Sequence, residues 1–382
     1  MRFFKSSATG GKKRPETSKD ATQNVFVPSD KLAWGVTPIT RADLDETLVQ
    51  IGKKIITWDS TRIVLVKQLQ EAARNHGRVE LMKDTTTNTP MAVKRMPTRW
   101  VRTSPQDFEK EYPSASEQPW YDIAYVKRLA TVGFPYVCEF YGMFRSDSET
   151  FVASQFCSEG DLFGWCDNSK VPAPGPGREE FMKPIVAQIF AAVRWMHDLG
   201  IAHRDLSLEN ILLEGGFGAD AKVKLIDFGM ATTTRMVANE IRGKNSYQAP
   251  EVHFPNEPVD TYLLDTFAVG VTIFAMSVHD YPWTCTRKGK CQLFQYVSNF
   301  GFRRFLQKRK LRRGRGETLN EVLTPAFVDT VAALVDFAPE KRGSLGEICY
   351  SQDVAQYRRL SVWDMPYMKE FADKVPQVCQ GN

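Results

Sequence analysis

The sequence lacks the features that mark several large classes of protein. No apolar run approaches the roughly 18 residues of a membrane-spanning helix, and the longest, residues 267–276, is expected to form a buried helix. The first residues, 1–5, lack the apolar stretch of a signal peptide. The seven cysteines are scattered without a CxxC pair, which indicates reduced thiols. These absences predict a soluble cytoplasmic or nuclear protein that makes no membrane contact.

The net charge is small, but basic residues are concentrated in one place. The formal net charge is only +5 over 382 residues. Basic residues gather late in the chain, at Arg303, Arg304, Lys308, Arg309, Lys310, Arg312, Arg313 and Arg315. This basic cluster, residues 303–315, is interpreted either as a solvated face or as a docking surface for an acidic partner. Aromatic residues are sparse in 308–315, so we do not expect nucleic-acid binding there.

Two short polar motifs carry the strongest chemical signal. Asp205 lies in the run HRDLSLEN at 203–210, and the triplet DFG at 227–229 begins 22 residues after it. Asp205 is suited to accept a proton from, or orient, an attacking hydroxyl. Asn210 and Asp227 offer the hard oxygen ligands that Mg²⁺ prefers. The pattern predicts a site that holds metal-bound phosphates beside a base.

Further motifs follow in a fixed order and together resemble the eukaryotic protein kinase family. The run 91–94 (MAVK) is similar to the family's VAIK strand, and Ala249-Pro250-Glu251 matches its APE motif. Asp265 opens a run similar to the start of the long buried helix of the large lobe. Arg342 falls where the family has an arginine that pairs with the APE glutamate. The resemblance covers roughly residues 61–345.

The resemblance implies an α+β, bilobal fold, with a small lobe of antiparallel β-sheet plus one helix and a larger helical lobe. The expected organisation is an N-terminal extension at 1–57, a kinase domain at 58–350 (lobes 58–156 and 157–350) and a tail at 351–382. Residues 1–30 are expected to be disordered. Residues 40–56 are predicted to form an amphipathic helix, with Thr40 as cap, Asp43 in a capping box, and a stripe of Leu44, Leu48, Ile51 and Ile55.

The resemblance also assigns roles to individual residues. Residues expected to contact ATP are Lys94, Asp122, Gly77, Val79, Ala92, Ser154, Gln155, Cys157, Asp161 and Leu212. Among these, Ser154 stands at the gatekeeper position, 155–157 form the hinge that binds adenine, and Asp161 reaches the ribose. Asn210 and Asp227 are the expected Mg²⁺ ligands. His203 and Phe228 are expected in the stacked column that links the lobes.

Three departures from the family pattern affect this site. The glycine-rich loop GxGxxG becomes 72–77 (AARNHG), so only Gly77 remains, and Arg74 and His76 either supply charge toward the phosphates or point outward. The acid that pairs with Lys94 is assigned to Asp122, although ungapped counting places Tyr125 there, and Glu117 is the fallback.

The third departure is an apparent exchange of residues. Ser207 stands where Ser/Thr kinases usually carry lysine, and Lys244 stands where they carry threonine. We predict that the two side chains meet beside Asp205, so that one cation and one hydroxyl remain at the catalytic centre.

A further replacement is expected in the activation segment, the part of the chain between the DFG and APE motifs. Glu240 occupies the position that family members often phosphorylate, and a carboxylate there can pair with Arg204.

The predicted function is ATP- and Mg²⁺-dependent phosphorylation of Ser/Thr residues in protein substrates, with Asp205, Lys94, Lys244 and Ser207 as catalytic residues. Asp161 and Glu209 further predict a preference for substrates that are basic upstream of the acceptor hydroxyl. The alternative is a pseudokinase scaffold with little or no nucleotide turnover, which the altered loop favours. The presence of all four polar residues Lys94, Asp205, Asn210 and Asp227 favours the enzyme.

Overall fold

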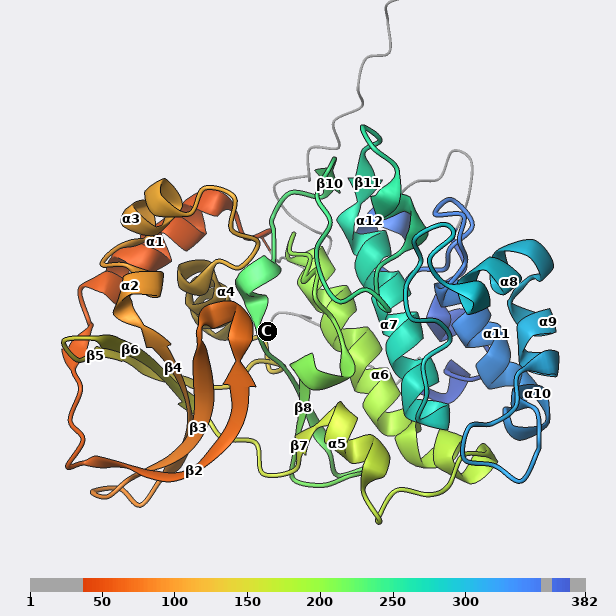
Figure 1. Cartoon of the computed structure of the whole chain (residues 1–382), viewed down its shortest axis with the longest axis horizontal. Helices are drawn as coiled ribbons and strands as arrows, with labels where there is room; N and C mark the ends of the chain where they lie inside the picture. Colours follow the sequence, from red (N-terminus) through yellow and green to blue (C-terminus); the bar gives the residue numbers. More distant parts are fainter. Residues whose placement is uncertain (1–36, 352–358, 372–382) are drawn as a thin grey trace, which may run out of the picture.

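The computed structural model describes residues 37–351 and 359–371, and it has two lobes (Figure 1). The disorder predicted for residues 1–30 lies outside the described residues. The small lobe contains one six-stranded sheet, drawn to the left in Figure 1, with strand order β1-β5-β6-β4-β3-β2. Its strands are β1 (Ile56–Thr57), β2 (Ile63–Ala72), β3 (Gly77–Asp84), β4 (Pro90–Pro97), β5 (Phe140–Arg145) and β6 (Glu149–Gln155). All pair antiparallel except β1 with β5.

Helices of the small lobe pack beside this sheet. They are α1 (Arg41–Gly52), α2 (Thr98–Val101), α3 (Pro105–Glu111) and α4 (Pro119–Thr131). Helix α1 begins as predicted, because Thr40 and Asp43 form the capping box. The prediction of a helix to residue 56 was wrong: α1 ends at Gly52, and Ile56 already belongs to β1. Ile55 still packs on the core, from extended chain.

Helix α1 lies directly on α4, the helix that carries Asp122. Leu44, Leu48 and Ile51 are buried in this contact region, and Asp43 pairs with Arg128 of α4 at 2.6 Å. The segment 97–119 also contributes to the lobe, because its residues Val101 and Phe108 are buried.

The large lobe is mainly helical and lies to the right in Figure 1. Its helices are α5 (Leu162–Asp167), α6 (Pro176–Asp198), α7 (Thr261–Val278), α8 (Gln292–Phe300), α9 (Phe302–Lys308), α10 (Leu319–Val322), α11 (Pro325–Leu334) and α12 (Ile348–Ser351). Short strands complete it: β7 (Gly160–Asp161), β8 (Ile211–Glu214), β9 (Lys222–Leu225), β10 (Met236–Val237) and β11 (Val259–Asp260). They form a β7-β8-β9 sheet and a β10-β11 pair. The predicted bilobal α+β fold is confirmed.

Helix α7 is the core of this lobe. Among the described residues it alone has the length and apolar character of a membrane span, and its residues are buried within the protein. It contacts α6, α11 and α5, so its apolar surface is fully used within the lobe. The buried helix expected at 267–276 is therefore present.

The described residues 359–371 add to the large lobe beyond the boundary predicted at 350. Val362, Trp363, Tyr367 and Met368 are buried in its core. Trp363 donates a hydrogen bond from Nε1 to the Leu345 carbonyl at 2.8 Å. This part of the predicted tail is thus a structural element of the lobe.

Candidate active site

The loop that carries Asp205 is held by a buried carboxylate of helix α7. The two oxygens of Asp265 accept hydrogen bonds from the backbone N–H groups of His203 (2.6 Å) and Arg204 (2.8 Å). Arg204 has a positive φ of 68°, which a non-glycine residue adopts only where the surroundings enforce it. The side-chain amide of Asn210 donates to the Asp205 carbonyl at 2.7 Å and to its Oδ2 at 3.1 Å. Asp205 is therefore fixed from both sides.

His197, at the end of α6, contacts the same Asp265 carboxylate through its imidazole. Its imidazole lies between Asp265 (3.1 Å) and Glu347 (2.8 Å) and is completely buried. Burial opposes the charged ring, but the two carboxylates outweigh burial and raise the pKa of His197 to about 9. The histidine is thus a cation that neutralises the acids behind the catalytic loop.

This pKa shift predicts a specific pH dependence of stability. Because the folded pKa exceeds the unfolded value of about 6.5, the stabilisation is complete below pH 6.5 and is lost as pH rises through about 9. A shift of this size corresponds to at most about 3 kcal/mol. We expect the unfolding free energy, measured with urea at pH 6.5, 7.5 and 9, to fall across this window and to flatten in His197→Gln. An equal slope in both proteins would assign the pH dependence to other groups.

Lys94 joins the lobes at the centre of the site. Its Nζ lies 3.0 Å from Asp122 Oδ2 on α4 and 3.0 Å from Asp227 Oδ1 on the opposite lobe. Burial lowers the pKa of Lys94, but Asp122 and Asp227 outweigh it and the net pKa is raised. Burial conversely disfavours the Asp227 carboxylate, yet Lys94 leaves its pKa below the usual value. Both groups are therefore charged at neutral pH.

Asp122 is the acid that the structure places at Lys94, as the sequence favoured. Its second oxygen accepts the Phe228 N–H at 2.8 Å, so α4 is tied to the DFG triplet as well. Tyr125, the ungapped alternative, is buried and stacks on Phe228 with ring centroids 6.3 Å apart. Phe228 in turn contacts His203 at 4.7 Å. The predicted column of His203 and Phe228 thus exists, and Tyr125 extends it, a role that the sequence did not reveal.

Glu117, the fallback acid, has a different place. Its side chain packs against Gly229, where a side-chain carbon would collide with it. Burial, followed by the charge of Asp227, raises the pKa of Glu117 to about 8. Glu117 is consequently a largely neutral acid beside the DFG triplet near pH 7, and Lys94 is left to Asp122.

The residues expected around adenine belong to adjoining elements. Val79 of β3 is paired in register with Lys94, and Ala92 of β4 is paired with Ser154 of β6. Leu212 lies opposite Asp161 in the β8–β7 pair. Val79, Ala92 and Ser154 thus belong to the small-lobe sheet, and Asp161 and Leu212 belong to the β7-β8-β9 sheet of the large lobe.

The hinge residues have further contacts of their own. Gln155 donates from its side chain to Glu214 at 2.7 Å, and Cys157 Sγ lies 3.7 Å from Cys138 Sγ. Asp161 caps helix α5 by accepting the Gly164 N–H at 2.7 Å. The side chain that the sequence assigns to ribose therefore also holds the start of a helix.

The turn that replaces the glycine-rich loop is a short 3₁₀ segment, Ala73–Asn75, between β2 and β3. Gly77 is required because a side-chain carbon there would collide with the Arg95 carbonyl. Arg74 does not point outward: its Nη1 lies 2.6 Å from Asp205 Oδ2. His76 turns away and packs edge-on against Trp100, at 4.6 Å between ring centroids. The sequence did not decide whether Arg74 and His76 face the phosphates or point outward. In the structure Arg74 faces Asp205, and His76 packs on Trp100.

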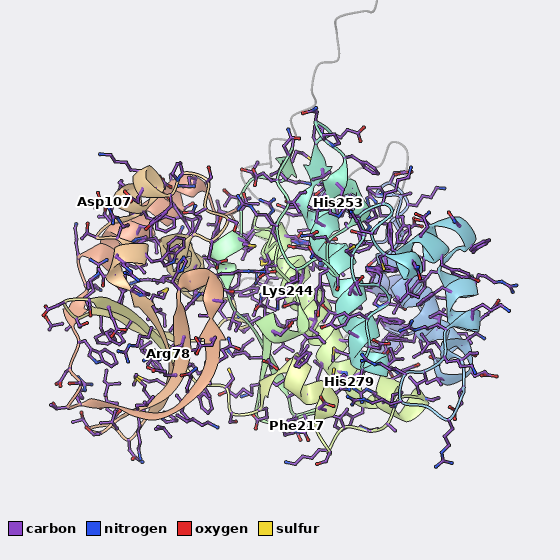
Figure 2. The ribbon with its side chains drawn as sticks, viewed as in Figure 1. Arg78, Asp107, Phe217, Lys244, His253 and His279 are labelled. Atoms are coloured by element: carbon purple, nitrogen blue, oxygen red, sulfur yellow. The ribbon has the colours of Figure 1, made fainter. Side chains whose placement is uncertain are left out.

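Lys244 and Ser207 meet as the exchange predicted. Lys244 Nζ donates to Ser207 Oγ at 2.9 Å and pairs with Glu209 at 2.9 Å. Gly243, just before the lysine, approaches Asp205 closely and has a positive φ of 78°. Lys244 lies in the central part of the molecule where the lobes meet (Figure 2). A cation and a hydroxyl thus stand together on the two loops that flank Asp205.

Three more ion pairs fix the segment after the DFG triplet. Arg204 pairs with Glu240 at 2.8 Å, and Arg242 contributes to the same carboxylate at 3.6 Å. Burial disfavours the Glu240 carboxylate, but these cations keep its pKa below the usual value. At the far end, Arg342 and Glu251 form a doubly hydrogen-bonded, buried pair at 2.6 and 3.0 Å. The segment is held at both ends without any added group.

Much of the basic cluster 303–315 is paired within the chain. Arg303 pairs with Asp329, Arg309 and Arg312 pair with Asp280, and Arg313 pairs with Asp167. This internal pairing reduces the positive charge available to an acidic partner.

The donor set fits a nucleotide with a magnesium ion. Among the described residues no cluster of three His, Cys, Asp or Glu side chains could hold a metal unaided. Mg²⁺ commonly uses one or two protein oxygens and completes its shell with water and phosphate oxygens, which suits Asp227 with Asn210. Asp205 Oδ1 is buried and has no hydrogen-bond partner, an acceptor that a substrate hydroxyl can satisfy. The residues present therefore match ATP and Mg²⁺.

Comparison with known proteins gives a consistent result. A family model described as protein kinase domain matches residues 75–352. The chain is 31% identical over 160 residues to serine/threonine-protein kinase kin-29 of Caenorhabditis briggsae, covering 41% of this chain and 18% of that protein. It is 28% identical over 237 residues to serine/threonine-protein kinase PRR2 of Saccharomyces cerevisiae, covering 60% and 31%. It is 32% identical over 168 residues to mouse serine/threonine-protein kinase 36, covering 43% and 11%. The aligned parts span less than a third of each of these relatives.

Proposed function

Because the chain belongs to the protein kinase family, we propose that it is an active serine/threonine kinase that phosphorylates hydroxyls of protein substrates. The observation that carries the proposal is Lys94 held between Asp122 and Asp227 at 3.0 Å each, across the lobes. This geometry assembles residues that are 133 positions apart in sequence. A scaffold has no chemical need for such a charged constellation, since burying charges costs free energy unless they are paired, and clusters of buried charged groups occur most often at functional sites.

Each residue has a defined task in this proposal. Bound ATP supplies the phosphoryl group, and Mg²⁺ neutralises its charge. Lys94 holds phosphate oxygens, and Asn210 and Asp227 hold the metal. Asp205 orients the acceptor hydroxyl and takes its proton through the oxygen that has no partner. Lys244 adds positive charge on the side of Ser207.

The competing function is a pseudokinase scaffold, which one specific observation favours. Arg74 pairs with Asp205 Oδ2, so one oxygen of the proposed base is engaged by a cation. The second oxygen remains without a partner, which is why the enzyme is the better-supported reading.

Phosphate transfer to a mixed peptide library tests the choice. We expect radiolabelled ATP to label Ser/Thr peptides with the wild type, and Asp205→Asn to lower the rate by about 10²–10⁴-fold. Equal labelling by the two proteins would indicate a contaminating kinase and would support the scaffold.

Phosphatase-treated recombinant protein should be used, because we propose that Glu240 replaces an activating phosphate by its contact with Arg204. Activity of this material is the expected result. Protein that is inert until an upstream kinase phosphorylates it would overturn the role of Glu240, and protein that is inert under both conditions would overturn the enzymatic function.

The exchange of Ser207 and Lys244 gives a second prediction. Ser207→Lys places two cations together, and Lys244→Thr leaves two hydroxyls without a cation, so each single variant is expected to lose about 10-fold or more in kcat/KM. The double variant Ser207→Lys/Lys244→Thr restores one cation and one hydroxyl in exchanged positions. Its kcat/KM should exceed that of the worse single variant. A double variant that is no more active would show that the two positions do not act as a unit.

The same library tests substrate choice. We propose a preference for basic residues upstream of the acceptor, from the carboxylates of Asp161 and Glu209, although Lys244 already neutralises part of the Glu209 charge. Docking of an acidic protein partner at 303–315 and a cytoplasmic or nuclear location stay predictions.

A further inference from the structure

The turn between β2 and β3 is held more rigidly than a glycine-rich loop would be. His76 is in the left-handed conformation (φ 54°) and packs on Trp100, while Asn75 is 3% exposed. Trp100 belongs to α2, so the turn is anchored to the rest of the small lobe. A backbone anchored in this way, with Ala72 and Arg74 in place of two glycines, is less free to fold closely over phosphates. Any compensating contact must come from a side chain.

Arg74 is the side chain of this turn that reaches the catalytic centre. Its Nη1 lies 2.6 Å from Asp205 Oδ2 and 4.0 Å from Met230 Sδ, next to the DFG triplet. Burial opposes its charge, but the nearby carboxylates, chiefly Asp205 and also Asp227, outweigh burial and raise the pKa of Arg74. The guanidinium therefore remains charged and sits within the field of the carboxylate expected to hold metal.

The contact with Arg74 engages Oδ2 of Asp205 and leaves only Oδ1 to a substrate hydroxyl. A base that takes a hydroxyl proton must offer an oxygen to the substrate, so movement of Arg74 away from Asp205 would free the second one. Asp205 is 3% exposed, whereas the Arg74 side chain is 40% exposed, so the arginine is the partner with room to move. A guanidinium is also the side-chain group whose planar donors best match phosphate oxygens.

The other cations near Asp205 are already committed. Lys94 is shared by Asp122 and Asp227, Lys244 is bound to Ser207 and Glu209, and Arg204 is bound to Glu240. Arg74 alone in this group pairs with Asp205 itself.

We propose that Arg74 is a nucleotide-binding residue that contacts the terminal phosphate of ATP in place of the missing glycines, and that it rests on Asp205 when no nucleotide is bound. This inference rests on the proposed kinase function. Under this proposal Arg74 covers Asp205 when no nucleotide is bound and contacts the third phosphate when ATP is bound. Binding of ATP is thereby coupled to release of Asp205, because one guanidinium cannot serve both anions fully.

Nucleotide affinity measured by calorimetry on the full chain tests this proposal without any turnover. Mg·ATP and Mg·ADP are titrated into wild type, Arg74→Ala, Arg74→Lys and Lys67→Ala; Lys67 is an exposed cation of strand β2, which leads into the turn. A charge-assisted hydrogen bond supports an expected loss of about 10-fold or more in ATP affinity for Arg74→Ala, with ADP affinity changed less than about 3-fold. Arg74→Lys should recover part of the loss, and Lys67→Ala should match wild type.

Asp205→Asn provides a second arm with the opposite sign. Loss of the carboxylate charge frees Arg74, so ATP affinity should rise relative to wild type, and the rise should vanish in Arg74→Ala/Asp205→Asn. Melting temperatures without nucleotide verify that each variant is folded.

The outcomes separate this proposal from the function on which it rests. If wild type binds ATP but Arg74→Ala keeps the same ATP/ADP affinity ratio, Arg74 is only a latch between the lobes and the proposal is overturned. If the rise in Asp205→Asn persists without Arg74, the coupling is overturned. If wild type binds neither nucleotide, the kinase function itself fails and this inference fails with it.

Discussion

Lys94→Met is expected to lower kcat/KM for phosphate transfer by about 10²–10³-fold, the loss typical of removing a preorganised charged donor. Methionine preserves the length and apolar stem of the side chain. It leaves Asp122 and Asp227 facing each other without the cation that lies 3.0 Å from both. The pKa of Asp227 should then rise, because Lys94 is what lowers it against the effect of burial. The single substitution Lys94→Met is therefore expected to weaken both phosphate binding and metal binding.

Steady-state kinetics with varied ATP measure this effect, and Lys222→Met is the matched control. Lys222 is an exposed lysine of β9 in the large lobe, so its replacement should leave kcat/KM within about 2-fold. Melting temperatures of the two variants exclude loss of folding as the cause. Full activity in Lys94→Met would mean that the constellation between the lobes is not used for catalysis.

Substitutions at Asp122 test how much activity depends on the carboxylate that pairs with Lys94. Asp122→Asn keeps an acceptor for the Phe228 N–H but removes the charge, whereas Asp122→Ala removes both. The expected order of activity is wild type, then asparagine, then alanine. Wild-type activity in the alanine variant would indicate that Asp227 alone, or another acid such as Glu117, can hold the lysine.

The parts of the site that could be predicted are those set by short-range chemistry along the chain. The capping box of Thr40 and Asp43 gave the start of α1, and motif order gave Lys94, Asp205 and Asp227. The end of α1 could not be read from periodicity, because Ile55 continues the apolar stripe and is partly buried from an extended segment. An apolar stripe reports burial, and burial alone does not distinguish a helix from the strand that follows it.

The sequence could not predict which way each side chain of the turn between β2 and β3 points. Arg74 and His76 are two residues apart, and both were candidates for the phosphate site. The ring of Trp100, supplied by a helix later in the chain, binds His76 and thereby leaves Arg74 facing Asp205. The helix at α3 could have been found, since Ser104, Pro105 and Asp107 form a capped start.

The largest loss of stability is expected from Arg342→Ala. Arg342 is fully buried, and its guanidinium forms two hydrogen bonds with the Glu251 carboxylate. It also donates to the carbonyls of Leu263 and Asp336 and lies over the Phe267 ring at 5.0 Å. Removing it leaves a buried carboxylate and two carbonyls without these donors. A broken buried pair of this kind costs about 3–5 kcal/mol.

Urea unfolding at pH 7 measures this loss, with Arg303→Ala as the control. Arg303 also pairs with an acid, Asp329, but the two side chains are 63% and 41% exposed. An exposed pair contributes about 0–1 kcal/mol, so the control should remain near wild type. The double variant Glu251→Leu/Arg342→Met removes both charges and should be more stable than Arg342→Ala, because the penalty comes from the orphaned carboxylate. If Arg342→Ala lost less than about 1 kcal/mol, solvent would have to reach Glu251, and the pair could not be what fastens the end of the activation segment to the large lobe.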